Sequence, residues 1–257
     1  SYQCKLFNLL GVIFHEERNL TKASEYYKLT YDIARKTRDI AGQRKSLHNL
    51  GLVKSAIGEY HSSLEYLNRN FELSRIMGYP ISIALSLNSL AVLQTRLNNM
   101  GRAEENLHEA IKINEKHNNT HGKIHNLYNL SRLYNYKEED EKSYNASSSA
   151  LELVFELQNE DARHIWICYL GINFCRQKNL KRAREMRDIF SDYIKKKTDH
   201  HSDEYDNYFN LLEGFLSLIK LENFLKDKKD DEASNDHIIS IEDKAGTHLN
   251  KYFTENK

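Results

Sequence analysis

Two adjacent histidines in the last quarter of the chain are its best candidates for metal chemistry. His200 and His201 are flanked by Asp199 and Asp203, and imidazole nitrogens and carboxylate oxygens are common zinc ligands. Neighbouring residues on a helix point about 100° apart, so two adjacent histidines seldom reach one ion. We therefore interpret the pair as part of a loop or a helix start, and expect no metal and no cofactor.

Motifs typical of catalysis or nucleotide binding are absent from the sequence. None of G-x-x-x-x-G-K, G-x-G-x-x-G, G-x-S-x-G and H-E-x-x-H occurs. Acidic clusters such as Glu16-Glu17 and the run from Lys137 to Glu141 fall where apolar periodicity breaks, which is typical of turns. The segment is predicted not to be an enzyme and shows no small-molecule substrate site. A catalytic domain elsewhere in a longer chain stays open.

The charge composition argues against nucleic acid and membranes as partners. Lys plus Arg number 37 and Asp plus Glu number 37, so there is no global field for phosphates or acidic lipid. Between Arg176 and Lys197 nine basic residues stand against three acidic ones, but the segment from Asp199 to Glu213 is acidic and offsets them. No apolar run approaches the roughly 18 to 20 residues that cross a bilayer.

The cysteines indicate a reducing compartment, and hence a cytoplasmic location. There are three, without a C-x-x-C pair. Cys168 and Cys175 lie on one helical face about 10 Å apart along the axis, too far for a disulfide, and are expected to be buried or groove-lining thiols. The chain begins at Ser1 without methionine or a signal-like segment, which is typical of a fragment or a processed piece.

An internal period of 40 residues defines the elements that position any site. Each repeat carries a leucine followed by a small residue, and a second small residue farther on. The leucines are Leu10, Leu50, Leu90, Leu130 and Leu170; the small residues are Gly11, Gly51, Ala91, Ser131 and Gly171, then Ala23, Ser63, Ala103, Ser143 and Ala183. Such a fixed period is the mark of a stacked-repeat architecture.

Within each repeat the apolar spacing is helical, and proline occurs once in the chain, so the fold is predicted to be all-α. Each unit is a helix A, a short polar turn and a helix B, with a second turn near residues 38–42, 78–82, 118–122 and 158–162. Gly42, Gly78 and Gly122 are expected to supply loop chemistry and helix caps there. The small residues are expected where helix A approaches helix B closely.

The pattern resembles the tetratricopeptide repeat family in its 40-residue variety, from Ser1 to about Thr198. The resemblance rests on the pair Leu50-Gly51, the small residue Ala103, the turn Gly58 to Tyr60, and aromatic residues in three repeats, namely Phe14, Tyr134 and Phe174. Lys54 and Gln94 stand where the family pattern has an aromatic residue, and Asp140 occupies a turn position that is usually apolar. The resemblance implies a right-handed α-solenoid of stacked antiparallel helix pairs, with helices A lining a concave groove.

Four segments are predicted. Residues 1–198 form five helical hairpins, and 199–225 form an atypical sixth unit, because Leu212 follows Leu170 by 42 residues rather than 40. Residues 226–237 are a charged linker. Residues 238–257 contain an amphipathic helix that either caps the stack or docks on another domain or partner.

The candidate partner-binding residues lie on the predicted helices A. Asparagine both donates and accepts hydrogen bonds, which suits the backbone of an extended peptide, and the arginines suit an acidic ligand. The candidates are Asn8, His48, Asn49, Asn88, Thr95, Arg96, Tyr128, Asn129, Arg132, Asn135 and Arg176. The carboxylate clamp that this family uses for heat-shock tails is not expected. The clamp requires asparagine at positions that in this chain hold other residues, namely Val12, Leu52, Val92, Arg132 and Ile172.

The resemblance therefore implies a non-catalytic protein-interaction module that binds a peptide or helical segment in its groove. Two alternatives stay open. The chain is the regulatory or sensor arm of a larger kinase, cyclase or caspase-like peptidase, whose groove holds an intramolecular segment, or it is part of a peptide-responsive transcription regulator.

Overall fold

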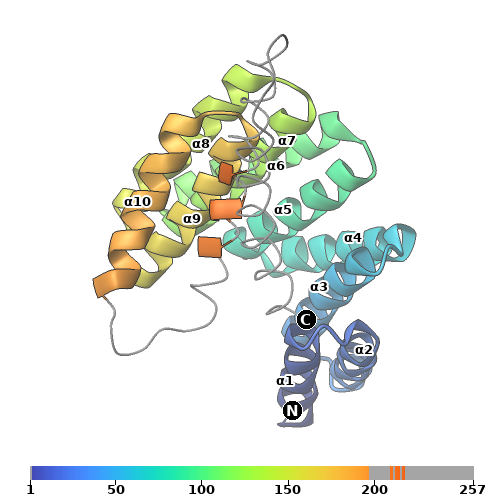
Figure 1. Ribbon diagram of the computed structural model, residues 1–257. Coiled ribbons are helices and arrows are strands. Elements are labelled where there is room, and N and C mark those ends of the chain that lie inside the picture. The colour runs from blue at the N-terminus through green and yellow to red at the C-terminus, as the bar shows by residue number, and fades with distance from the viewer. Residues whose placement is uncertain (1, 197–208, 211, 215, 218–257) are drawn as a thin grey trace, which may run out of the picture. The chain divides into compact units, whose positions relative to one another are not determined.

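The computed structural model describes residues 2–196, 209–210, 212–214 and 216–217, and these contain helices and turns but no strand. Ten helices follow one another in this part of the chain (Figure 1). The helices A are α1 (Tyr2–Glu16), α3 (Ile40–Ala56), α5 (Pro80–Arg96), α7 (Thr120–Tyr136) and α9 (Glu160–Arg176). The helices B are α2 (Leu20–Lys36), α4 (Tyr60–Met77), α6 (Met100–Lys116), α8 (Asp140–Phe155) and α10 (Leu180–Lys196).

The helices pack in consecutive pairs, and the residues fall into two compact units, 1–133 and 134–257. In the first unit α1 packs on α2, α3 on α4 and α5 on α6, and α2 also packs on α3 and α4 on α5. In the second unit α8 packs on α9 and α9 on α10. The predicted all-α fold of stacked helix pairs is confirmed. None of the described helices is long and apolar enough to cross a membrane.

Most helices end in the same three-residue turn. After α1, Arg18 adopts a left-handed backbone; its N–H donates to the His15 carbonyl at 3.1 Å, and the Asn19 N–H donates to the Phe14 carbonyl at 2.8 Å. This is the Schellman pattern, which satisfies carbonyls left without a partner at a helix end. The left-handed position recurs every 20 residues except at 158, at Arg18, Arg38, Gly58, Gly78, Asn98, Asn118, Glu138 and Lys178.

The residue that ends one helix also begins the next. Asn19 closes the Schellman turn through its N–H, and its side chain then accepts a hydrogen bond from the N–H of Lys22 at 3.2 Å. Asp39 does the same for α3, accepting from the Gly42 N–H at 2.9 Å. Because one residue serves both helix ends, the connection is held short and the successive helices run antiparallel.

Two glycines have a different role from the one predicted. Gly78 does cap α4 with a left-handed backbone. Gly42 and Gly122, however, lie inside the first turns of α3 and α7. A Cβ on Gly42 would lie 2.6 Å from a carboxylate oxygen of Asp39, and one on Gly122 would lie 2.7 Å from Oδ1 of Asn114. A side chain at either position would collide with a capping or buried polar side chain, so only glycine fits there.

We expect Arg38→Gly to stabilise the chain by about 0.5 to 1 kcal/mol. Arg38 is exposed with a φ of 55°, where a side chain costs about 1 to 2 kcal/mol and glycine does not. The control is Lys36→Gly, in the last turn of α2, which should destabilise by about 1 kcal/mol. Urea unfolding curves measure both, and a lower midpoint for Arg38→Gly would contradict the turn assignment.

The small residues lie where helices A and B meet, as predicted. A Cβ on Gly51 would lie 2.5 Å from Cδ2 of Leu67, and one on Gly11 would lie 2.5 Å from Cε1 of Tyr27. Ala23, Ser63 and Ala103 on the helices B have no exposed surface. Large side chains at these positions would hold the paired backbones apart.

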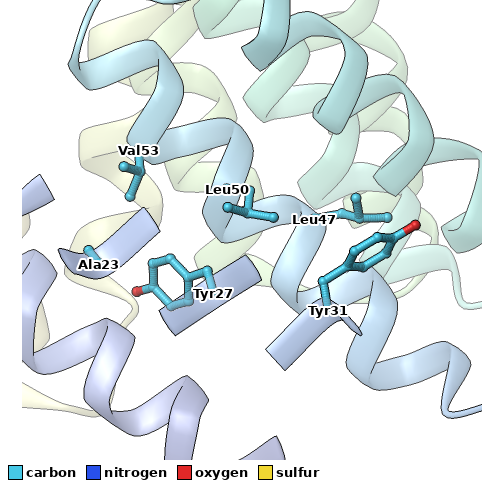
Figure 2. Close-up of a cluster of buried hydrophobic side chains, with 6 residues drawn as sticks. All are labelled: Ala23, Tyr27, Tyr31, Leu47, Leu50 and Val53. Carbon is cyan, nitrogen blue, oxygen red and sulfur yellow. The ribbon is translucent and has the colours of Figure 1, made fainter. Parts of the chain in front are cut away.

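The core of the first unit continues from one repeat into the next. Figure 2 shows three side chains of α2 (Ala23, Tyr27, Tyr31) beside three of α3 (Leu47, Leu50, Val53), all buried. In the next repeat Leu67 of α4 is clustered with Leu90 and Leu93 of α5. Each hairpin therefore depends on its neighbours for burial of its apolar face, as is typical of repeat arrays.

Part of the predicted sixth unit is described. Leu212 and Leu216 are helical and fully buried, and Phe209 stacks on Phe190 of α10 with the ring centroids 6.5 Å apart. Cys168 and Cys175 are buried and form no disulfide, as expected from the sequence, and Cys4 is buried as well. The histidine pair, the charged linker and the C-terminal helix lie outside the described residues.

Candidate partner-binding face

One face of the helices A in the first unit is built from equivalent positions of successive repeats. The positions three and seven residues apart on a helix share a side. We call this surface the A face; its residues are Lys5, Asn8, Val12, Lys45, His48, Leu52, Leu85, Val92, His125, Tyr128 and Arg132, whereas Asn88 holds the equivalent position on α5 but is buried. Neighbouring helices A touch directly, since Asn49 Nδ2 donates to Asn8 Oδ1 at 3.3 Å and Arg96 donates to the Ser55 carbonyl at 3.0 Å.

The helices A of this unit carry an excess of positive charge. Helices α1, α3, α5 and α7 hold one acidic residue, Glu16, and seven basic ones. Helices α2, α4 and α6 hold eight acidic and nine basic residues, so their charge is balanced. Charge is therefore segregated by helix although the chain is neutral as a whole. The A side of the unit attracts negatively charged groups.

Along the A face, cations lie at both ends and apolar side chains in the middle. Lys5 and Lys45 are exposed at the first end, and Arg132 lies at the other, 5.7 Å from the Tyr128 ring centroid. Between them Leu52 and Val92 are partly exposed, and Leu85 is 42% exposed. This order of charges suits a ligand with a central apolar part and acidic ends.

A hollow of about 270 Å³ opens at the first cationic end, between α1, α2 and α3. Its polar lining includes Lys5, Arg44, Lys45 and Asn8, and Asp39 is the one acidic residue among the described residues that line it. Nε of Arg44 is buried without a hydrogen-bond partner, and burial lowers the pKa of this guanidinium. A hollow with three cations and an unused buried donor is suited to a carboxylate.

His48, one helical turn after Arg44 on α3, is neutral. Burial, and secondly the Arg44 cation, lower the pKa of His48 to about 4. Its Nδ1 is buried without a hydrogen-bond partner. Burial and the nearby Arg132 also lower the pKa of His125 at the opposite end of the A face. An acidic ligand would offset the contribution of the two cations to these pKa shifts, but not the contribution of burial.

We expect His48 to make the fold sensitive to mild acid. Its pKa is about 4 in the folded chain and about 6.5 when unfolded, so the unfolded state takes up the proton first. Stability is then lost as pH falls from about 6.5 to 4, by roughly 3 kcal/mol. His48→Gln should remove that part of the loss, whereas His61→Gln, whose side chain is 91% exposed, should not. Urea unfolding at pH 7 and pH 4.5 measures the difference; equal losses in all three proteins would contradict it.

Two of the predicted asparagines, Asn88 and Asn129, belong to the interior. Asn88 is 4% exposed, and its Oδ1 accepts hydrogen bonds from Nδ2 of Asn126 and of Asn129, both at 2.9 Å. Asn126 in turn accepts from Nδ2 of Asn114 at 2.6 Å, and Asn114 accepts from Nδ2 of Asn119 at 2.7 Å. The chain of five amides joins α5, α6 and α7. These asparagines connect repeats and do not present free amides to a ligand.

The remaining candidates are distributed over both units. In the first, Thr95 hydrogen-bonds the Ala91 carbonyl of its own helix, and Arg96 is exposed although it bonds Ser55. In the second, Asn135 Nδ2 donates to Asn173 Oδ1 at 3.3 Å, and Arg176 is exposed. Asn8, His48, Asn49, Tyr128 and Arg132 are the candidates that reach the surface on or beside the A face.

Sequence reasoning missed Arg44 as a site residue. Its counterparts in the other repeats of this unit are Cys4, Ala84 and Ile124, all apolar. A cation in a series of otherwise apolar positions is a signal that could have been read from the repeat alignment. The segregation of charge between helices A and B was also visible in the sequence once the repeat boundaries were known.

Comparisons with known proteins place the chain among helical-repeat proteins. Residues 50–139 match the family model of anaphase-promoting complex subunit 5. Tetratricopeptide repeat protein 29 of Trypanosoma brucei brucei is 25% identical over 149 residues, which are 57% of this chain and 30% of that protein. The chain therefore spans less than a third of the length of this curated relative.

Solved structures share the fold at low sequence identity. The apo form of RapI superposes with a TM-score of 0.65 at 12% identity, covering 97% of this chain and 85% of that one. A signal transduction ATPase with numerous domains and a tetratricopeptide repeat sensor, from Pyrococcus horikoshii, gives 0.63 at 19% identity, covering 98% of this chain and 36% of that one. At these identities the likeness shows the fold, a solenoid of tetratricopeptide-like repeats.

Proposed function

We propose, from the premise that this chain is a tetratricopeptide-repeat protein, that it uses the A face of its first unit to bind a protein segment. Repeat folds of this kind are generally scaffolds for protein interactions, and the fold leaves the choice of partner to its surface. The partner is a peptide or a helix with one or more apolar side chains near its middle and acidic residues towards both ends.

The segregation of charge carries this proposal. One acidic residue against seven basic ones on α1, α3, α5 and α7 is not needed for folding, because α2, α4 and α6 are balanced in the same packing. Two of the seven, Lys54 and Lys123, form ion pairs with Glu59 and Glu115. Lys5, Arg44 and Lys45 form no ion pair within the described part of the chain, and they meet at one hollow.

The apolar middle of the face supplies affinity, and the charged ends supply orientation. Leu85 is the most exposed of the apolar residues there, and covering its remaining 42% contributes roughly 1 kcal/mol. Surface ion pairs contribute about 1 kcal/mol or less each, but they favour acidic partners over basic ones and speed association. Asn8 and Asn49 lie beside the hollow, where their amides are suited to contact a bound backbone.

A regulatory arm of a larger protein is the second candidate, and it uses the same face. The Pyrococcus horikoshii structure combines such repeats, named there as a sensor, with further domains, and this chain covers 36% of it. In that case the acidic segment is intramolecular, and a competing partner releases it. A free partner and an intramolecular segment would bind through the same residues of the A face.

A peptide library displayed on phage tests the proposal. Selection on the whole chain should enrich peptides with Asp or Glu on both sides of Leu, Phe or Ile, and the enriched peptides should fail to bind Lys45→Glu/Arg132→Glu. The matched control is Lys28→Glu, an exposed lysine on α2, which should retain them. Enrichment of basic peptides, or equal retention by all three proteins, would refute the assignment of the A face.

A further inference from the structure

We propose that the hollow between α1, α2 and α3 binds the phosphate group of a phosphorylated side chain in the partner segment. Phosphorylation of the partner then controls its affinity for the A face. This inference rests on the proposed function, because it names the group that the partner places at the first cationic end of the A face. The charge of the hollow, its hydrogen-bond donors and its size support a phosphate over a carboxylate.

The charge of the hollow matches a dianion. Lys5, Arg44 and Lys45 line it, and Asp39 is the one acidic residue among the described residues that do so, which leaves a net charge of +2. The three cations form no ion pair in the described part of the chain. A phosphorylated side chain carries about −1.5 to −2 near neutral pH, whereas a carboxylate carries a single negative charge. A phosphate therefore neutralises the hollow, and a carboxylate offsets only half of its charge.

The polar groups of the hollow that are left for a ligand are hydrogen-bond donors. Nε of Arg44 is buried without a hydrogen-bond partner. Oδ1 of Asn8 already accepts from Nδ2 of Asn49 at 3.3 Å, so the amide hydrogens of Asn8 are left for a ligand. Oδ1 of Asp39 is occupied as well, because it accepts from the Gly42 N–H at 2.9 Å. Together with two lysine ammonium groups, these donors suit the three terminal oxygens of a phosphate, which only accept.

The space for this group comes from a change in the repeat pattern. In the second repeat Asn70 of α4 fills the equivalent place: its Nδ2 donates to the Arg44 carbonyl at 2.7 Å, and its Oδ1 accepts from Ser86 of α5 at 2.6 Å. The first repeat has Thr30 there, whose hydroxyl donates to the Tyr26 carbonyl of its own helix at 2.9 Å. The shorter side chain leaves the hollow of about 270 Å³ open, with room for roughly nine water molecules at about 30 Å³ each.

Arg44 is positioned for an anion before a ligand binds. The hydrogen bond from Asn70 holds its backbone, and burial lowers the pKa of its guanidinium because the charged form is desolvated. A desolvated cation gains more from an anion than an exposed one does, because less water competes for it. The equivalent positions hold Cys4, Ala84 and Ile124. The repeats therefore pack without a cation here, which leaves ligand binding as the use of Arg44.

Fluorescence anisotropy with a peptide from the library selection tests the inference on the whole chain. The peptide is made in its parent form and in two phosphorylated forms, each with phosphoserine in place of an acidic residue at one end. One phosphopeptide should bind about tenfold more tightly than the parent. The other should bind within about twofold of the parent, because at the far end of the A face Arg132 is the only cation among its residues and lies 5.7 Å from the Tyr128 ring centroid.

Arg44→Met should remove the gain from phosphorylation, because it keeps a long side chain but loses the charge and the Nε donor. Binding of the parent peptide should weaken by less than about threefold. The matched control is Arg102→Met, at an exposed arginine of α6, which should keep the full gain. Circular dichroism checks that both variants keep their helical content.

Nuclear magnetic resonance observes the buried donor directly. The Nε–H signal of Arg44 is identified by its absence in Arg44→Met. It should shift when the tighter phosphopeptide is added, because Nε gains an acceptor, and it should stay in place with the parent peptide of the same sequence. Titration with inorganic phosphate, against chloride at equal ionic strength, shows whether the hollow also takes the free anion.

The outcomes separate this inference from the proposed function. If peptides bind through the A face but phosphoserine at neither end tightens binding by more than about twofold, the inference is wrong and the proposed function stands. A gain that Arg44→Met retains, or an Arg44 signal that the phosphopeptide leaves unchanged, also overturns the inference, because the phosphate is then elsewhere. If no peptide depends on the A face, the proposed function fails. A response of Arg44 to inorganic phosphate alone then assigns the hollow to a free anion, which overturns the inference too.

Discussion

Leu90→Ala is expected to lower the free energy of unfolding by about 2 to 5 kcal/mol. Leu90 of α5 is 4% exposed and lies in a cluster with Leu67 of α4 and Leu93. The truncation opens a cavity between the second and third repeats, so it weakens both the packing of α5 and the coupling of two hairpins. A repeat array depends on such nearest-neighbour contacts for its cooperativity.

Urea unfolding followed by circular dichroism measures this effect, with Leu85→Ala as control. Leu85 is on the same helix but 42% exposed, so its truncation should cost less than about 1 kcal/mol. We also expect a broader transition for Leu90→Ala, because the two halves of the first unit become less coupled. Equal midpoints for Leu90→Ala and Leu85→Ala would show that the repeat register is wrong.

Asn126→Leu is expected to cost about 2 to 4 kcal/mol although leucine has nearly the same size. Asn126 is 2% exposed; it donates to Asn88 and accepts from Asn114. Leucine removes both hydrogen bonds and leaves an amide hydrogen of Asn114 buried without that partner. An unsatisfied buried group costs about 1 to 3 kcal/mol.

A double-mutant cycle separates the hydrogen bond from other effects. Asn114→Ala and Asn126→Ala should each destabilise the chain, and the double variant should cost at least about 0.5 kcal/mol less than their sum, since the bond is lost only once. Strict additivity would mean that the 2.6 Å contact between the two amides contributes nothing.

The fold could be predicted from the sequence because its causes repeat. The pairs Leu50-Gly51 and Leu90-Ala91 indicate that the backbones of helices A and B lie close together. A Cβ on Gly51 would indeed lie 2.5 Å from Leu67. The turns were harder to predict. Left-handed positions usually signal glycine, but here Arg18, Arg38 and Glu138 adopt them, because two Schellman hydrogen bonds fix the backbone whichever side chain is present.

The site was predicted less well, because repeat position alone does not distinguish a surface amide from a buried one. Asn8 and Asn88 are equivalent in sequence, yet Asn8 is partly exposed whereas Asn88 has Asn126 and Asn129 as partners. Asn126 itself replaces the serine of the two preceding repeats, Ser46 and Ser86, and this change gives the buried chain of amides its central member. Which polar side chains find partners depends on contacts between repeats, which the period does not encode.

The central claim is that the A face of the first unit, and not the balanced helices B, holds the partner. Its most direct test is titration of a fluorescent peptide, taken from the library selection, into the whole chain and its charge variants at constant ionic strength. Lys45→Glu and Arg132→Glu should each weaken binding about tenfold, whereas Lys28→Glu on α2 should leave it within about twofold. Equal affinity for wild type, Lys45→Glu and Arg132→Glu, or a loss confined to Lys28→Glu, would contradict the account.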